Sequence, residues 1–251
     1  MVGKILKRSK YVELSSKAAR SDRLEALIEF VAQTKPKHLE ESLKTGLKSE
    51  AQLFQDLFAL DETNFKQNGY FVEFGATNGK SLSNSYVLEK YFGWNGILSE
   101  PARTWHADLL KNRNVNIDMR CVWSSSGESI EFREVKKSPQ ISTIDAFTND
   151  DMHAKKRHNS ITYAVETISL SDLLKHYDAP KEIDYLSIDT EGTEFEILKN
   201  FNFDKYKIRV ITVEHNHTKN QQKLRSLLTN NGYKEMYSKW SDFDSWYVLT
   251  S

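Results

Sequence analysis

The sequence predicts an α/β fold with a mostly parallel sheet and helices on both faces. From Tyr70 onward, short apolar runs alternate with helical patterns, and such alternation is typical of βαβ units in a parallel sheet. The alternation ends in two consecutive strands joined by a polar turn around Asp242. With 251 residues, 39% of them apolar, the chain can bury a sizeable core without disulfides or a metal.

Residues 1–67 precede this alternation and are expected to form a helical extension to a main domain over residues 68–251. The helical spacing i, i+3, i+4, i+7 is occupied by four apolar residues, Leu24, Leu27, Ile28 and Val31. This spacing predicts a helix that buries all four side chains. Pro36 interrupts the pattern, and a second helix is predicted to start at Ser49, where Ser49–Gln52 fits a capping box.

The strands and helices of the main domain follow in chain order. Apolar runs predict strands at Tyr70–Phe74, Gly96–Ser99, Val115–Trp123, Ser129–Val135, Ile183–Ile188, Ile208–Glu214, Tyr233–Tyr237 and Ser245–Leu249. Helical patterns predict helices at Leu82–Phe92, Ala102–Lys111, Leu170–Tyr177 with Ser169 as N-cap, Thr193–Asn200, and from a capping box at Thr218–Gln221 to Asn231.

One long segment breaks this rhythm. Lys136–Thr162 is polar, contains Pro139 and has no clear period. A loop of this length inside a compact domain is usually functional or disordered. Two hypotheses therefore stay open, a lid over a substrate and a flexible insertion.

Charge and cysteine content narrow the classes of function. The chain has 35 basic and 35 acidic residues, whereas a nucleic-acid binder usually has a basic excess, so no nucleic-acid partner is expected. The lone Cys121 cannot pair within the chain, which favours a reducing compartment and a cytoplasmic location. Apolar runs are far shorter than the roughly 20 residues of a membrane helix, so no integral membrane segment is expected. The sequence carries no signal for the oligomeric state.

A glycine-containing loop follows the first predicted strand. Gly75 and Gly79 lie four positions apart, between this strand and a helix, and glycine lets the backbone approach a ligand closely. A plain tight turn would look the same. Glu100 follows the second strand, where a carboxylate can accept hydrogen bonds from both hydroxyls of a ribose. Together the two features favour a nucleoside cofactor, and the carboxylate disfavours a phosphorylated ribose.

Two further strands end in acidic residues. Ile183–Ile188 leads into Asp189, and Ile208–Val213 leads into Glu214 and His215. Because parallel strands deliver their carboxyl ends to one edge of a sheet, a catalytic centre of Asp189, Glu214 and His215 is expected there. A general base, oxygen ligands for a divalent cation and hydrogen bonds to a cofactor all fit. Helix capping by Asp189 and ordinary solvated acids are the structural alternative.

Three segments in combination resemble the FkbM family of S-adenosylmethionine-dependent methyltransferases. They are FVEFGATNGKSLSNSYVLEKYFGWNGILSEP, IDYLSIDTEGTEFEIL and VITVEH. The D-x-E-G-x-E block at Asp189–Glu194 is the most characteristic of these motifs. The resemblance extends from about Gln52 to the C-terminus and implies a Rossmann-like class I methyltransferase fold, whose seven-stranded sheet ends in an antiparallel hairpin.

The resemblance also implies roles for particular residues. Glu73, Gly75 and Gly79 would surround the methionine part of S-adenosylmethionine, and Asp189 would also contact the cofactor. Glu100 would hold the ribose, and Val122 with its neighbours would line the adenine slot. Departures exist as well: Thr77 and Asn78 stand where many methyltransferases have glycine, and no family motif matches Lys136–Thr162.

The implied acceptor is a small molecule or a glycan that carries a hydroxyl group, such as a sugar or a secondary metabolite. Such a hydroxyl needs a base or a metal for activation at neutral pH. If a divalent cation binds, Asp189 and Glu214 would be its oxygen ligands, and Asn216 could add a carbonyl. Because the resemblance supplies no metal signature, the metal-free version is favoured, with Glu214 or His215 taking the proton.

Two alternatives from other classes remain. A non-catalytic module could retain the fold and the cofactor. A nucleoside-cofactor oxidoreductase is disfavoured, because the G-x-G-x-x-G pattern is missing.

Overall fold

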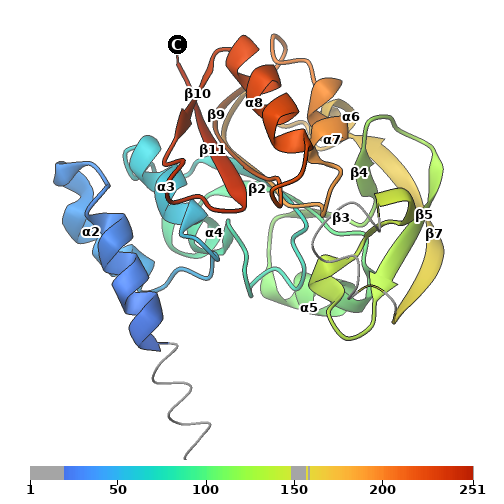
Figure 1. Cartoon of the computed structure of the whole chain (residues 1–251), viewed down its shortest axis with the longest axis horizontal. Helices are drawn as coiled ribbons and strands as arrows, with labels where there is room; N and C mark the ends of the chain where they lie inside the picture. The colour runs from blue at the N-terminus through green and yellow to red at the C-terminus, as the bar shows by residue number, and fades with distance from the viewer. Residues whose placement is uncertain (1–19, 148–156, 158, 251) are drawn as a thin grey trace, which may run out of the picture.

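The main sheet has seven strands, and the computed structural model describes residues 20–147, 157 and 159–250 of the chain (Figure 1). In spatial order the strands are β10 (Tyr233–Met236), β11 (Asp244–Leu249), β9 (Lys207–Glu214), β8 (Glu182–Ile188), β1 (Tyr70–Phe74), β2 (Asn95–Ser99) and β3 (Asn116–Asp118). Strands β3, β2, β1, β8 and β9 pair in parallel. Strand β11 lies antiparallel between β9 and β10. The predicted parallel sheet with an antiparallel end is confirmed.

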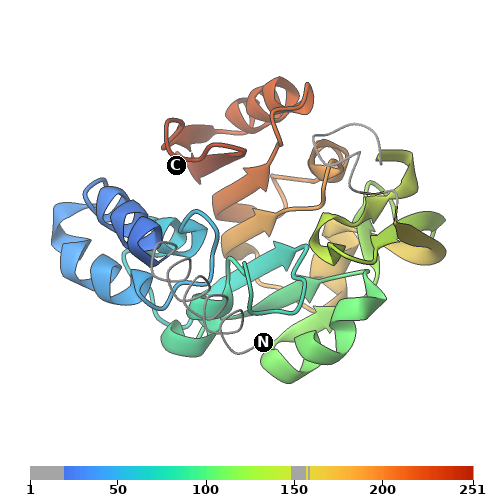
Figure 2. The same ribbon diagram turned by 60° about the horizontal axis from the view of Figure 1, so that its bottom comes forward.

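A second, smaller sheet lies at the opposite end of the molecule from the N-terminal helices (Figures 1 and 2). Its order is β4 (Cys121–Trp123), β7 (Ser160–Ser169), β5 (Ser129–Val135) and β6 (Thr143–Ile144). The prediction of one strand over Val115–Trp123 was wrong, because the chain turns after Asp118. The Asp118 carboxylate accepts a hydrogen bond from the Arg120 backbone at 2.8 Å, and the chain then enters the smaller sheet.

The smaller sheet also gives structure to part of the segment that has no sequence period. Strand β6 and the start of β7 both fall within residues 136–162. Strand β7 has long exposed stretches, so it lacks the apolar run that marks a buried strand. Its β-branched residues and its pairing with β5 over seven residue pairs hold it instead.

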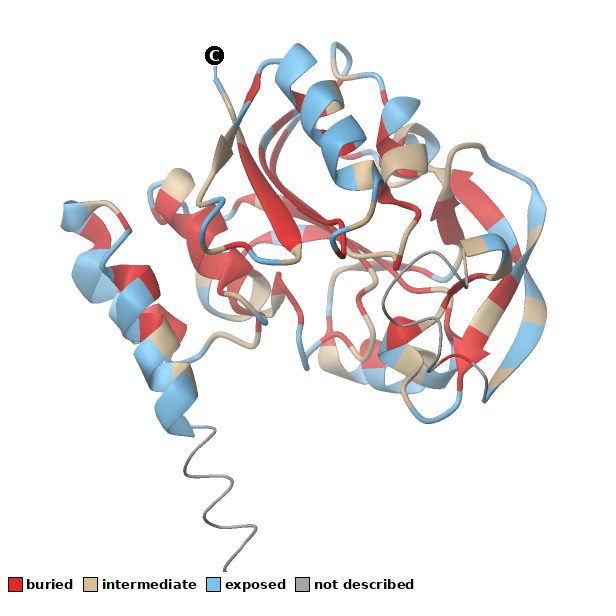
Figure 3. Cartoon of the chain, viewed as in Figure 1, coloured by how far each residue is buried: buried red, intermediate tan, exposed pale blue. Residues whose placement is uncertain are grey.

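Helices cover both faces of the main sheet, as predicted. The helices are residues 20–31, α2 (Leu39–Gly46), α3 (Gln55–Glu62), α4 (Tyr86–Phe92), α5 (His106–Asn112), α6 (Leu170–His176), α7 (Glu194–Lys199) and α8 (Asn220–Asn230), with 3₁₀ turns at Pro36–His38, Arg103–Trp105, Pro139–Ile141 and Asp145–Phe147. Along β1, Phe71 joins the core under α3 and α4, whereas Val72 joins the core under α6, α7 and α8. Side chains alternate between the two faces along a strand. The buried strands of Figure 3 therefore contribute side chains to two cores, one on each face of the main sheet.

The helix over residues 20–31 is part of the core that contains Phe71. Phe30 is fully buried, and its ring lies 5.6 Å from that of Trp240 and 6.1 Å from that of Trp246. The prediction that Leu24 and Ile28 are buried was wrong, since they are 45% and 55% exposed. The buried stripe is centred on Phe30 instead, with Leu27 and Val31 beside it.

Two predicted capping boxes do not form. Helix α3 begins at Gln55 rather than at Ser49. The Ser49 hydroxyl donates to the carboxylate of Asp56, in the first turn of α3, at 2.8 Å, so it does not act as an N-cap at Ser49. The N-cap of α8 is Lys219, without a side-chain cap, and the Gln221 amide nitrogen lies 3.1 Å from Nε2 of His215. Ser169 caps α6 as predicted, accepting a hydrogen bond from the Asp172 backbone.

No helix in the described part of the chain is long and apolar enough to cross a membrane.

We expect Phe30→Ala to lower the free energy of unfolding by about 3–5 kcal/mol, since it removes a fully buried ring. The matched control on the same helix is Ile28→Ala, which is expected to change stability by no more than about 0.5 kcal/mol. Urea unfolding of both variants measures the difference. Equal, small effects would show that this helix is not part of the core.

Candidate active site

A cavity of about 390 Å³ lies at the carboxyl ends of the central strands. This is the edge where open α/β sheets bind ligands, and the volume is within the range of small-molecule sites. The main sheet contributes Phe74, Gly75, Ser99, Glu100, Asp189 and Glu214 to its lining. The smaller sheet and the segment after it contribute Cys121, Val122, Phe132, Pro139, Ile141 and Ile144.

Gly75 stands where β1 and β8 leave the sheet together. Its φ is +74°, and a Cβ atom at this position would lie 1.9 Å from the carbonyl oxygen of Asp189. Any larger residue would push the two strand ends apart. This glycine therefore keeps the loop after β1 against the acidic block after β8.

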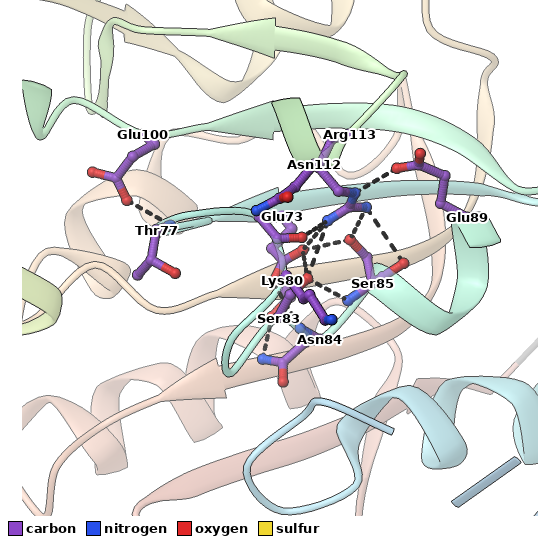
Figure 4. Close-up of polar contacts among 12 residues, drawn as sticks. Glu73, Thr77, Lys80, Ser83, Asn84, Ser85, Glu89, Glu100, Asn112 and Arg113 are labelled. Atoms are coloured by element: carbon purple, nitrogen blue, oxygen red, sulfur yellow. Dashed lines mark hydrogen bonds and ion pairs between the residues drawn. The ribbon is translucent and has the colours of Figure 1, made fainter. Parts of the chain in front are cut away.

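The loop from Gly75 to Ser85 is held from behind by Glu73 (Figure 4). The Glu73 carboxylate accepts hydrogen bonds from the Ser83 hydroxyl at 2.9 Å, the Asn84 backbone at 2.7 Å and the Ser85 hydroxyl. Glu73 is buried and does not line the cavity. These bonds shape residues 83–85 as a loop, so the helix predicted from Leu82 begins only at Tyr86.

Arg113, at the end of α5, completes this support. Its guanidinium donates to the Gly79 carbonyl at 3.0 Å and to the Ser83 and Ser85 hydroxyls at 3.1 and 2.9 Å, and it pairs with Glu89 (Figure 4). A Cβ at Gly79 would lie 2.6 Å from Arg113 Cγ, so Gly79 faces α5 and does not line the cavity. Sequence reasoning missed Arg113, because nothing in its local pattern distinguishes it from a surface arginine.

Glu100 lies on the cavity wall and is 5% exposed. Its two carboxylate oxygens each accept a hydrogen bond at 2.8 Å, one from the Thr77 backbone and one from the Ala102 backbone. Burial raises the pKa of Glu100 to about 7, and the nearby Glu134 carboxylate adds to the shift. Val122 and Cys121 lie on the same wall. Cys121 is a free, buried cysteine, and burial raises the pKa of its thiol to about 12.

Asp189 and Glu214 meet in the cavity, as the sequence predicted. The two carboxylates lie side by side, with one oxygen of each within 4.8 Å of the other. Burial, followed by repulsion from Asp244, raises the pKa of Asp189 to about 7. Burial and the Asp189 charge raise the pKa of Glu214 well above its ordinary value. Glu191 lies beside them, and one oxygen from each of the three carboxylates lies within 4.8 Å of the others.

His215 does not line the cavity. Its Nε2 donates to the Asp244 carbonyl at 2.9 Å, and its Nδ1 accepts from the His217 backbone at 3.1 Å. Burial lowers the pKa of the ring, so it stays neutral at pH 7 and ties the end of β9 to β11. The structure thus brings together Asp189 and Glu214 and places His215 behind them.

The described part of residues 136–162 forms one wall of the cavity. Pro139, Ile141 and Ile144 contribute to the lining. The fully buried Arg157 donates to the Ile141 carbonyl at 2.7 Å and pairs with Glu191 at 3.0 Å. The segment is therefore attached to the acidic block. Residues 148–156 and 158 of this segment lie outside the described residues.

Comparison with known proteins agrees with this geometry. A family model described as "Methyltransferase FkbM domain" matches residues 73–235, more than half of the chain. The chain belongs to the FkbM methyltransferase family. The resemblance seen in its sequence and the implied Rossmann-like fold are confirmed, and the family is one that uses S-adenosylmethionine.

Two individual proteins are also similar to this FkbM methyltransferase. Methyltransferase sdnD of Sordaria araneosa is 26% identical over 197 residues, which cover 66% of this chain and 75% of that protein. The crystal structure of precorrin-6y C5,15-methyltransferase from Geobacter metallireducens GS-15 aligns with a TM-score of 0.41 and 11% identity, over 72% of this chain and 71% of that one.

The raised pKa of Glu100 predicts a pH-dependent stability. The folded state keeps a proton on Glu100 up to about pH 7, whereas the unfolded chain loses it near pH 4.5. The unfolded state therefore binds fewer protons in this window, and stability falls as pH rises through it. Glu100→Gln should reduce the fall between pH 5 and pH 8 by about 2–3 kcal/mol.

Urea unfolding at a series of pH values measures this slope, so a uniform offset in stability between the proteins does not matter. Glu131→Gln, an exposed change on β5, is the control and should retain the wild-type slope. A Glu100→Gln slope equal to that of wild type would show that Glu100 is ionised throughout.

Proposed function

We propose that this FkbM methyltransferase transfers a methyl group from S-adenosylmethionine to a hydroxyl oxygen of a sugar, a glycan or a secondary metabolite. The observation that supports this most is the Asp189–Glu214 carboxyl pair, which lies in the same cavity as Gly75, Glu100 and Val122. One part of the cavity thus offers cofactor contacts, and the other offers groups that can activate an acceptor.

The residues present fit S-adenosylmethionine. Glu100 lines the cavity, and its carboxylate can take hydrogen bonds from ribose hydroxyls, while Val122, Ile141 and Ile144 offer apolar surface for an adenine. The backbone at Gly75 has no side chain to exclude the methionine part. In this proposal Glu73 and Gly79 act on the methionine part indirectly, by shaping the loop that carries Gly75 and Thr77.

The protein itself must remove the proton from the acceptor hydroxyl. When bound, S-adenosylmethionine supplies an electrophilic methyl carbon, so a carbon–sulfur bond breaks, a carbon–oxygen bond forms, and the hydroxyl loses one proton. Asp189, with a pKa of about 7, is suited to receive this proton. In this proposal Glu214, whose carboxylate lies beside that of Asp189, shares this acid–base role. His215 serves as a positioning residue, because both of its ring nitrogens bond to backbone groups.

The segment over residues 136–162 acts as a lid in this proposal. Its described part already lines the cavity, and its Arg157 bonds to Glu191. Closure over the two substrates would exclude water from the methyl transfer. The lone Cys121 supports the associated proposal of a cytoplasmic location.

Cofactor binding is the first test of this function. Calorimetry should show binding of S-adenosylmethionine and S-adenosylhomocysteine but not of NAD. At pH 8, above the pKa of Glu100, Glu100→Gln is expected to weaken S-adenosylmethionine binding by about 1.5–3 kcal/mol, or roughly 10- to 150-fold, since it removes a charge-assisted hydrogen bond. The exposed variant Glu131→Gln should bind like wild type. Unchanged affinity in Glu100→Gln would exclude Glu100 from the cofactor site.

Turnover tests the carboxyl pair. With an acceptor found by screening hydroxylated sugars and metabolites for S-adenosylhomocysteine formation, Glu214→Gln should lower kcat by about 10²–10⁴, the usual loss for a positioned acid–base group. Affinity for S-adenosylmethionine should stay within twofold. Wild-type turnover in this variant would place proton removal elsewhere, and cofactor binding without turnover on any acceptor would favour the non-catalytic alternative.

A further inference from the structure

We propose that Asp189, Glu191 and Glu214 form a binding site for a hard divalent cation such as Mg²⁺ or Mn²⁺. The site itself is argued from geometry, and its role in activating an acceptor hydroxyl rests on the proposed function. The cation would lie inside the cavity, on the side opposite Glu100.

The spacing of the three carboxylates fits a single ion. One oxygen from each lies within 4.8 Å of the other two. Oxygen ligands on opposite sides of an ion are separated by twice the metal–oxygen distance, about 4.2 Å for Mg²⁺ and about 4.6–5.2 Å for Ca²⁺. All three residues line the cavity, so an ion held by them could also contact a bound acceptor.

An unpartnered oxygen points to the same site independently. Glu214 is only 7% exposed, and its Oε2 is buried and has no hydrogen-bond partner in the structure. A buried carboxylate oxygen left without a partner is costly. Within the described residues, neither Asp189 nor Glu214 forms an ion pair, and no Lys, Arg or His lines the cavity.

The remaining acid of the D-x-E-G-x-E block, Glu194, holds this geometry. Glu194 turns back and accepts hydrogen bonds from the backbone of Thr190 at 3.0 Å and of Gly192 at 2.9 Å. Glu191 between them adopts a left-handed φ of +58°, and Thr143 donates to its carbonyl at 2.9 Å. The motif thus divides into two ligand residues, Asp189 and Glu191, and one residue, Glu194, that folds their loop.

Arg157 sets the orientation of the Glu191 carboxylate. Its Nη2 lies 3.0 Å from Oε2 of Glu191, and it comes from the segment that lines the cavity. A carboxylate has two oxygens and can accept from a guanidinium while binding an ion. In the proposed function, an ion at this place would lower the pKa of the acceptor hydroxyl, so that the hydroxyl could release its proton to solvent water.

Mn²⁺ titration of the metal-free full chain tests the site, with free Mn²⁺ followed by electron paramagnetic resonance. Wild type should bind one Mn²⁺ per chain, and Mg²⁺ should compete. Glu214→Gln and Asp189→Asn, which keep side-chain shape, should each weaken Mn²⁺ binding at least tenfold. Glu100→Gln, which removes a carboxylate from the same cavity, should bind Mn²⁺ like wild type.

Calorimetry with S-adenosylmethionine, run on the same proteins without metal, separates this inference from the proposed function. Glu214→Gln should retain cofactor affinity and Glu100→Gln should lose it, the reverse of their Mn²⁺ results, which also shows that both variants are folded. No Mn²⁺ binding by wild type at millimolar concentration, or equal binding in all three variants, overturns the site even if methyl transfer is found. Mn²⁺ binding without S-adenosylmethionine binding would retain the site and reject the function.

Discussion

The contact between the ends of β1 and β8 is the constraint on which the cavity depends. Gly75 and the Asp189 carbonyl approach so closely that no side chain fits between them. The loop on one side carries the proposed cofactor contacts, and the block on the other side carries the acids. Because the two strands pair in register from Phe71 to Phe74, the sheet itself sets the separation between the two halves of the site.

A second level of support comes from buried charge. The loop after β1 has little regular secondary structure, so side chains must satisfy its backbone. Glu73 and Arg113, whose charged groups lie 3.8 Å apart, do this together, and both are almost completely buried. A buried ion pair is a weak source of net stability. Its value here is that it defines one conformation for a loop that lacks a hydrogen-bonded ladder of its own.

The fold was predictable from the sequence where the burial of an element produces a regular pattern of apolar residues. Strands β1, β2, β8 and β9 are apolar runs because both of their faces are covered, and their predicted ranges agree with the structure to within one residue. Strand β7 escaped prediction because much of it is exposed. The two capping boxes failed because the Ser49 hydroxyl bonds to the Asp56 carboxylate, seven residues further along the chain, and Gln221 lies against His215.

The position of a candidate site residue was predictable where an acidic side chain lies at the carboxyl end of a predicted strand, as with Glu100, Asp189 and Glu214. It was not predictable for Arg113 and Arg157, whose partners are distant in sequence, or for the direction in which the His215 ring points.

The packing of Phe30 against Trp246 has a consequence for how the chain reaches this state. The two residues are separated by almost the whole described chain, yet their rings lie 6.1 Å apart. Contacts of such long sequence separation require a large loop to close and form slowly. The sheet around β1 and β8 can assemble before the helix over residues 20–31 docks, so we expect this helix to dock late in folding. Until then, the part of the Trp246 ring that Phe30 covers would be open to a chaperone or to another unfinished chain.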